Sequence, residues 1–138
     1  CKSFFTTTNT KGELIQVDTK GNISRQRLNL EANHDITTSA KTLVVRNENK
    51  LSINMNNVDL EYGKYSSPSL FYLNDKIYVT ITDLQAKKIW IFDSMAKPFI
   101  EIPVYGTSGI DLANTDDDPS LEFVTKGDAK SIILYQIN

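Results

Sequence analysis

Short stretches of β-forming residues recur along this chain at a nearly constant spacing. The segments GELIQVD, NKLSINM, KKIWIFD and AKSIILY begin at residues 12, 49, 87 and 129, so successive copies are offset by 37, 38 and 42 residues. Each segment follows another β-rich run, namely FFTTTN, LVVRN, IYVTIT and EFVTKG. A repeat of this kind constrains the fold strongly, because one unit cannot bury its apolar face alone and must stack on its neighbours.

The links between these runs predict antiparallel hairpins. No segment carries the apolar spacing of an amphipathic helix. Glycine in the turns 9–13, 18–22 and 125–130 is expected at positive φ, and Asn or Asp is expected to serve the same purpose in the turns 46–50 and 73–76. Tight turns of this kind join neighbouring antiparallel strands, so the chain is predicted to form β-meanders.

Within a run, alternation predicts which side chains share a face. In the segment 88–93, Ile89 and Ile91 are expected on one face of the strand, and Trp90 and Phe92 on the other. The Asp that ends this strand is expected to accept hydrogen bonds from backbone N–H groups of the following turn.

A unit of about forty residues with four short antiparallel strands is typical of a β-propeller blade. The four units of this single domain span approximately 1–31, 34–65, 66–105 and 106–138. The first unit lacks its first strand and the last lacks its fourth, so the predicted fold class is all-β with about three and a half blades of a partial ring. Propellers typically close with four to eight blades, so we expect the chain to be a C-terminal part of a longer parent chain that supplies the other blades. The alternative is a second copy, which would complete a homodimeric ring of about seven blades. A non-propeller sandwich of the same repeats is the alternative.

Residues 77–99 resemble an NHL-type propeller repeat, and 14–23 resemble the last part of that repeat. The matching residues are Asp83, Ile89, Ile91, Phe92, Asp93 and Phe99. Lys88 stands where Arg is usual, and Ala86 and Ala96 replace the Asn and the turn Gly. The resemblance implies blades with apolar residues packed between them. It implies no ligand, since propellers host unrelated functions.

Residues 111–125, DLANTDDDPSLEFVT, resemble the acidic loop of FG-GAP or VCBS-type propeller repeats, which binds calcium between the first two strands of a blade. The side-chain ligands that this resemblance implies are Asn114, Asp116, Asp118 and Glu122. Calcium prefers six to eight hard oxygen ligands, which alternating acids on a tight loop can supply. Pro119 stands where the turn Gly is usual, and the first ligand is a neutral Asn. The alternative is an acidic β-turn whose charges lie in water.

The composition bounds the classes of function. The formal net charge is −2 and the basic residues are scattered, so nucleic-acid binding is not expected. Mean hydropathy is −0.31 and no long apolar run occurs, so no membrane span is expected. The single cysteine, Cys1, allows no internal disulfide. Cys1 could be the lipidated N-terminus of a bacterial lipoprotein, but a cut point in a longer chain is the favoured interpretation.

No catalytic constellation is evident, so no catalytic or cofactor-binding residue is predicted. His34, the only histidine, lies beside Asp35 without a Ser or Cys nucleophile motif, and zinc, P-loop and dinucleotide motifs are absent from the sequence. The acids Asp59, Glu61 and Glu101 are expected on outer strands, where charge keeps sheet edges unpaired, and not as a glycosidase pair.

Aromatic residues gather in the segment 62–78. They are Tyr62, Tyr65, Phe71, Tyr72 and Tyr78. We expect them to fill space between blades, with a carbohydrate or peptide surface as the alternative.

The sequence therefore predicts a non-enzymatic β-propeller-like scaffold or interaction module within a larger cell-envelope protein. The expected setting is extracytoplasmic, in the periplasm or on the cell surface of a bacterium, and calcium is the one cofactor expected. Two alternative functions stay open. One is half of a propeller hydrolase or lyase whose active-site loops lie partly in other blades, and the other is a calcium-dependent carbohydrate-binding or adhesive module.

Overall fold

The computed structural model describes residues 4–39, 41–100 and 104–137, and these form fourteen β-strands and no helix. The strands are grouped in four antiparallel sheets, which confirms the all-β prediction. The first sheet contains β1 (Phe4–Thr8), β2 (Glu13–Asp18) and β3 (Ile23–Arg27). The second contains β4 (His34–Ser39), β5 (Thr42–Asn47), β6 (Lys50–Ile53) and β7 (Asn56–Asp59). The third contains β8 (Ser69–Leu73), β9 (Lys76–Asp83), β10 (Lys88–Asp93) and β11 (Val104–Tyr105). The fourth contains β12 (Asp111–Ala113), β13 (Glu122–Lys126) and β14 (Ile132–Gln136).

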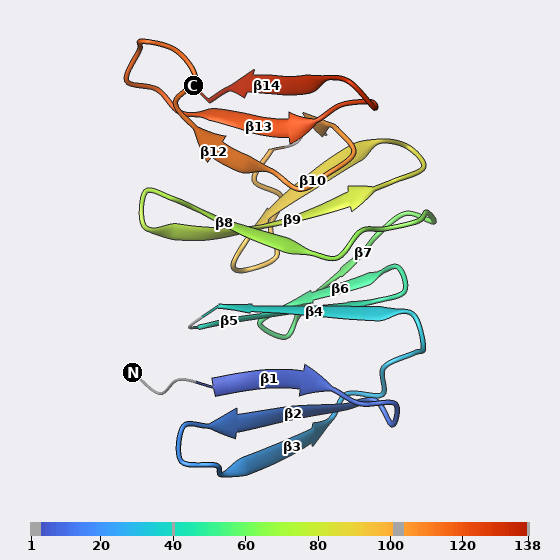
Figure 1. Cartoon of the computed structure of the whole chain (residues 1–138). Helices are drawn as coiled ribbons and strands as arrows, with labels where there is room; N and C mark the ends of the chain where they lie inside the picture. Colours follow the sequence, from blue (N-terminus) through green and yellow to red (C-terminus); the bar gives the residue numbers. More distant parts are fainter. Residues whose placement is uncertain (1–3, 40, 101–103, 138) are drawn as a thin grey trace.

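The four sheets lie face to face in chain order, with the first and the fourth at opposite ends of an open stack (Figure 1). Within each sheet, strands adjacent in the chain are also hydrogen-bonded neighbours. Each sheet lies within one repeat unit of the sequence. The described residues form no closed ring, and they contain no helix that is long and apolar enough to cross a membrane.

Two apolar clusters join the inner sheets. The cluster between the second and third sheets is built from Val44, Leu51, Ile53, Leu60, Tyr65, Val79, Ile81 and Phe92. The cluster between the third and fourth sheets is built from Phe71, Tyr78, Ile89, Ile91, Val104, Ile110 and Phe123. Burial of these side chains is the main source of stability that the sheets share, because one sheet alone leaves its apolar face in water.

Strand β10 contributes side chains to both clusters, as the alternation of its residues predicts. Ile89 and Ile91 pack toward the fourth sheet, while Phe92 and the partly buried Trp90 pack toward the second. The third sheet is therefore apolar on both faces. This is the pattern of a strand between two covering layers, whereas a surface strand would alternate with polar residues.

Polar contacts join the first sheet to the second. His34 on β4 accepts a hydrogen bond from the Thr8 hydroxyl, 2.9 Å from its Nε2, and its Nδ1 donates to the Glu31 carbonyl at 2.6 Å. Leu14 is the one buried hydrophobic side chain that the first sheet contributes among the described residues. This interface is consequently less apolar than the two interfaces that hold the clusters.

The turns bear out most of the expected backbone conformations. Gly12 and Gly21 have φ of 71° and 84°, and Asn74 and Asp75 are also at positive φ, as predicted. The prediction for Gly127 is wrong, because its φ is not positive. Its N–H instead donates to the Ser131 carbonyl, and an added Cβ there would collide with the Ser131 hydroxyl.

A second turn also departs from expectation. In the turn 46–50 the residue at positive φ is Glu48, with φ of 53°, and neither neighbouring Asn. Asn47 is used differently, because its side-chain oxygen accepts a hydrogen bond from the Glu31 backbone at 2.8 Å.

The Asp residues that end β2 and β10 close the next turn in the same way. The Asp18 carboxylate accepts N–H bonds from Lys20 and Asn22, both at 2.9 Å. The Asp93 carboxylate accepts N–H bonds from Met95 at 2.8 Å and Lys97 at 3.0 Å, which confirms the role predicted for this Asp. The side-chain hydrogen bond from Asn22, followed by the backbone bonds, lowers the pKa of Asp18 below its usual value.

Four hairpins set a common register, and they join β1 to β2, β5 to β6, β9 to β10 and β13 to β14. The residue pairs that close these hairpins are Asn9 with Glu13, Asn47 with Lys50, Asp83 with Lys88, and Gly127 with Ser131. The residues that come next on β2, β6, β10 and β14 are therefore equivalent, and they are Leu14, Leu51, Ile89 and Ile132. The sequence alignment of the last repeat is wrong by one residue, because AKSIILY begins one residue before the end of its hairpin loop, whereas the other three segments begin at the last residue of theirs. Since side chains alternate, this slip exchanges the two faces of β14.

Candidate metal centre

The acidic segment forms the loop between the first two strands of the fourth sheet, at the end of the stack. Pairing of Asp111 with Val124 and of Ala113 with Glu122 brings the two ends of the loop together. Glu122 is the first residue of β13, and Asp116 and Asp118 lie in the loop itself. The antiparallel pairing therefore carries the acids of the loop back toward the acid of the strand.

Three of the four predicted ligands converge. Carboxylate oxygens of Asp116, Asp118 and Glu122 all lie within 4.8 Å of one another. Two oxygens on opposite sides of one calcium ion are about 4.6–5.2 Å apart, since each calcium–oxygen distance is about 2.3–2.6 Å. The spacing of the three carboxylates is therefore compatible with one shared ion.

Glu122 is the unusual member, because it is only 5% exposed. Its Oε2 accepts hydrogen bonds from the backbone N–H of Thr115 at 2.8 Å and from the Thr115 hydroxyl at 3.0 Å. Its Oε1 is buried and has no hydrogen-bond partner among the described residues. An ionised group buried in this way is costly unless a cation or donor satisfies it.

The loop acids use one oxygen each to hold the loop. Asp116 Oδ1 accepts the N–H of Asp118 at 2.9 Å, and Asp118 Oδ1 accepts the N–H of Ser120 at 2.7 Å. In the described part of the chain the second oxygen of each carboxylate accepts no hydrogen bond. One free oxygen from each of the three acids thus remains for an ion.

The side-chain amide of Asn114 donates a hydrogen bond to the Asp118 carbonyl at 2.5 Å. Its role as a fourth ligand stays a prediction. Thr115 was not singled out from the sequence, although its two bonds orient Glu122. A hydroxyl residue next to the first acid of the loop is the signal that could have identified it.

The other polar candidates are engaged elsewhere. The ring of His34 is held by Thr8 and the Glu31 carbonyl, while Asp35 forms an ion pair with Arg46 at 2.6 Å. Arg46 is buried, and the same guanidinium also donates to the Glu48 carbonyl and to Asn33. This ion pair is a structural feature of the second sheet, and His34 and Asp35 do not act as a pair.

The prediction that three acids lie on outer strands is confirmed for one residue and wrong for another. Asp59 ends β7 and is exposed, as expected. Glu61 lies two residues beyond this strand, so its outer-strand assignment is wrong. Glu101 and Cys1 lie outside the described residues.

The aromatic residues of the segment 62–78 include both buried and exposed side chains. Tyr65, Phe71 and Tyr78 are buried, and the rings of Phe71 and Tyr78 stack with centroids 5.3 Å apart, so these three fill space between sheets. Tyr62 and Tyr72 are exposed. Burial, and secondarily the nearby carboxylates of Asp83 and Glu61, raises the pKa of Tyr65 to about 12. The Tyr65 hydroxyl donates to the Glu61 carbonyl at 2.6 Å.

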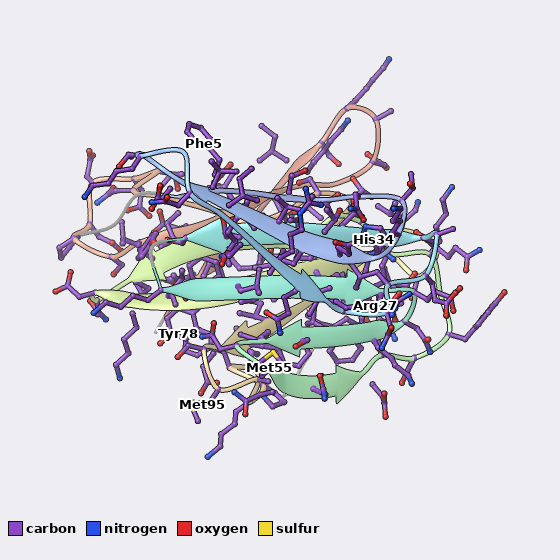
Figure 2. All side chains as sticks on the ribbon, turned by 90° about the horizontal axis from the view of Figure 1, so that it is seen from below. Phe5, Arg27, His34, Met55, Tyr78 and Met95 are labelled. Atoms are coloured by element: carbon purple, nitrogen blue, oxygen red, sulfur yellow. The ribbon has the colours of Figure 1, made fainter. Side chains whose placement is uncertain are left out.

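A groove of about 1030 Å³ separates part of the first sheet from the second. Leu28, Leu43 and Val45 line it together with the polar side chains of Lys50 and Asp59. Figure 2, which views the stack from the first sheet, shows the side that carries Met55 uncovered by β1–β3.

No family model, curated protein or solved structure matches this chain. The resemblances to NHL and to FG-GAP or VCBS repeats therefore stay predictions.

Proposed function

We propose that this chain is a non-enzymatic scaffold or interaction module of propeller-type blades, whose last unit binds calcium through Asp116, Asp118 and Glu122. Two observations carry the calcium site: the carboxylates of Asp116, Asp118 and Glu122 converge, and Oε1 of Glu122 is buried without a hydrogen-bond partner among the described residues. A divalent cation would neutralise this oxygen, and hard carboxylate oxygens are the ligands that calcium prefers.

The blade assignment is supported by three properties of the sheets. They contain three or four antiparallel strands each, they follow one another in chain order, and apolar clusters fill two of the spaces between them. A propeller blade is likewise an antiparallel sheet of four short strands, and it buries its faces against the neighbouring blades. The enzyme-half and adhesive alternatives stay predictions.

Bound calcium has a structural role in this proposal. It would tie the loop that contains Asp116 and Asp118 to the first residue of β13, and so fix the edge of the fourth sheet. Calcium sites of extracellular modules have dissociation constants of about 10⁻⁴–10⁻³ M. We propose an extracytoplasmic, bacterial cell-envelope setting for the module, in which a calcium site of this class would fill.

Thermal unfolding with and without calcium tests the site. At a calcium concentration about 100 times the dissociation constant, binding stabilises the native state by about 2.7 kcal/mol. We expect Tm to rise with calcium in the wild-type chain and to respond little to equal magnesium, which prefers a smaller octahedral site.

Two isosteric variants separate the site from its surroundings. Glu122→Gln should abolish the calcium response, because a neutral amide replaces the charged carboxylate of the group. Asp117→Asn changes the same net charge in the same loop but lies outside the converging group, so it should keep the response. Absence of any calcium effect on Tm in the wild type, or an equal response in all three proteins, would refute the site.

A further inference from the structure

The fourth sheet exposes apolar side chains at positions that the inner sheets bury. Ile132 and Leu134 are 72% and 51% exposed. The equivalent residues on β10, Ile89 and Ile91, are 0% and 3% exposed, because the next sheet covers them. The outer face of the fourth sheet therefore resembles a covered face from which the cover is missing.

The first sheet has the matching property on its opposite face. Phe5 pairs with Val17, just as Val79 pairs with Phe92 and Phe123 with Tyr135; these pairs occupy one register. Phe5 is 78% exposed, whereas Val79 and Phe123 are buried against the preceding sheet. Ile15, Val17 and Ile23 lie on the same outer face as Phe5, by the strand pairing. Figure 2 shows Phe5 at this end of the stack.

The charges of the two ends are opposite. Residues 4–27 contain four basic and two acidic side chains, and residues 104–137 contain two basic and six acidic. The units between them are balanced, with three of each sign in 34–59 and four of each in 69–105. Strand pairing places Arg25 and Arg27 on the outer face of the first sheet with Glu13, which forms an ion pair with Arg25 at 3.7 Å. It places Asp111 and Lys126 on the outer face of the fourth sheet. Complementary charge of this kind favours the contact of one end with the other and disfavours the contact of like ends.

We propose that copies of this chain associate head to tail, with the fourth sheet of one copy packed on the first sheet of the next. The contact continues the face-to-face packing of the stack and covers Ile132 and Leu134 with the face that carries Phe5. Such a contact is heterologous, so it closes into a ring or grows open. Two copies hold eight sheets, four from each, which lies within the range of four to eight at which propellers close. The proposal does not depend on calcium.

A pair of complementary variants tests the orientation. Leu134→Glu disables only the face of the fourth sheet, and Phe5→Glu disables only the face of the first, because a charge buried against apolar side chains is costly. Both residues are exposed within one copy, so both variants should fold. Light scattering then gives the mass of each variant alone and of their equimolar mixture.

Head-to-tail association predicts a specific pattern of masses. The wild-type mass should rise with concentration above 15.6 kDa, to twice that value or more. Each variant alone should stay at 15.6 kDa, since it lacks one of the two faces. The mixture should form a dimer through the two intact faces, one from each variant. Association of the wild type should weaken at high salt, because the end charges attract.

Met95→Glu is the control, since Met95 is 61% exposed in the turn after β10, away from both end faces. It should associate like the wild type. A wild type that stays at 15.6 kDa over a hundredfold range of concentration would overturn the proposal and leave the end faces to further sheets of a longer chain. Continued dimerisation of either variant alone would also overturn it, because a like-to-like interface would then operate.

Discussion

Truncation of isoleucine at two equivalent positions should have very different effects on stability. Ile89 and Ile132 both follow the residue that closes the hairpin, but Ile89 is 0% exposed and Ile132 is 72% exposed. Ile→Ala removes three carbon atoms, and a buried methylene contributes about 0.8 kcal/mol, so Ile89→Ala loses about 2.4 kcal/mol from transfer alone. The cavity adds to this loss, and the total should fall within about 2–5 kcal/mol.

The same truncation of Ile132 should change the free energy of unfolding by at most about 0.5 kcal/mol, because a surface side chain has little native contact to lose. The assay is equilibrium urea unfolding at low protein concentration. Both truncations are made in the Phe5→Glu background, so that association does not contribute to the measured stability. Equal costs at the two positions, or a larger cost at Ile132, would refute both the register and the order of the sheets.

Three further predictions concern single interactions. Asp35→Ala should destabilise the protein by about 1.5–3 kcal/mol, because the buried Arg46 guanidinium loses its carboxylate partner, and Arg46→Met should cost clearly less in the same urea assay. Asp93→Ala removes the acceptor of two backbone N–H groups and should cost about 1 kcal/mol, whereas Asp59→Ala, at an exposed acid, should be neutral; a neutral Asp93→Ala would contradict the turn. The native pKa of Tyr65 is about 12 and its ordinary value is 10.0, so the unfolded chain ionises first and the wild type should lose stability relative to Tyr65→Phe as pH rises between these values; a constant difference would contradict the shift.

The sequence predicted the elements of this fold because their causes are local. Alternation within the segment 88–93 correctly assigned Ile89 and Trp90 to opposite faces, and glycine correctly marked two of the turns. The register of the last repeat was assigned wrongly by one residue, because it depends on which residue closes the hairpin with Gly127. Gly127 was misread for a related reason, since its lack of a side chain makes room for Ser131 and does not serve positive φ.

The sequence predicted which carboxylates form the candidate site, but it did not predict that one of them is buried without a hydrogen-bond partner. The spacing of acids nominated Asp116, Asp118 and Glu122, which the hairpin brings together. Burial of Glu122 and the unpartnered state of its Oε1 depend on how the loop folds over β13, which no local pattern encodes. Exposure of Phe5 and Ile132 likewise could not be read from the sequence, because the same residue types at the same register are buried wherever a neighbouring sheet is present.

The calcium site is best tested by calorimetric titration of calcium into the wild-type chain, Glu122→Gln and Asp117→Asn. We expect one calcium ion bound per wild-type chain, no binding by Glu122→Gln, and unchanged binding by Asp117→Asn. Binding that survives in Glu122→Gln, or no binding heat in the wild type at millimolar calcium, would contradict the proposed site.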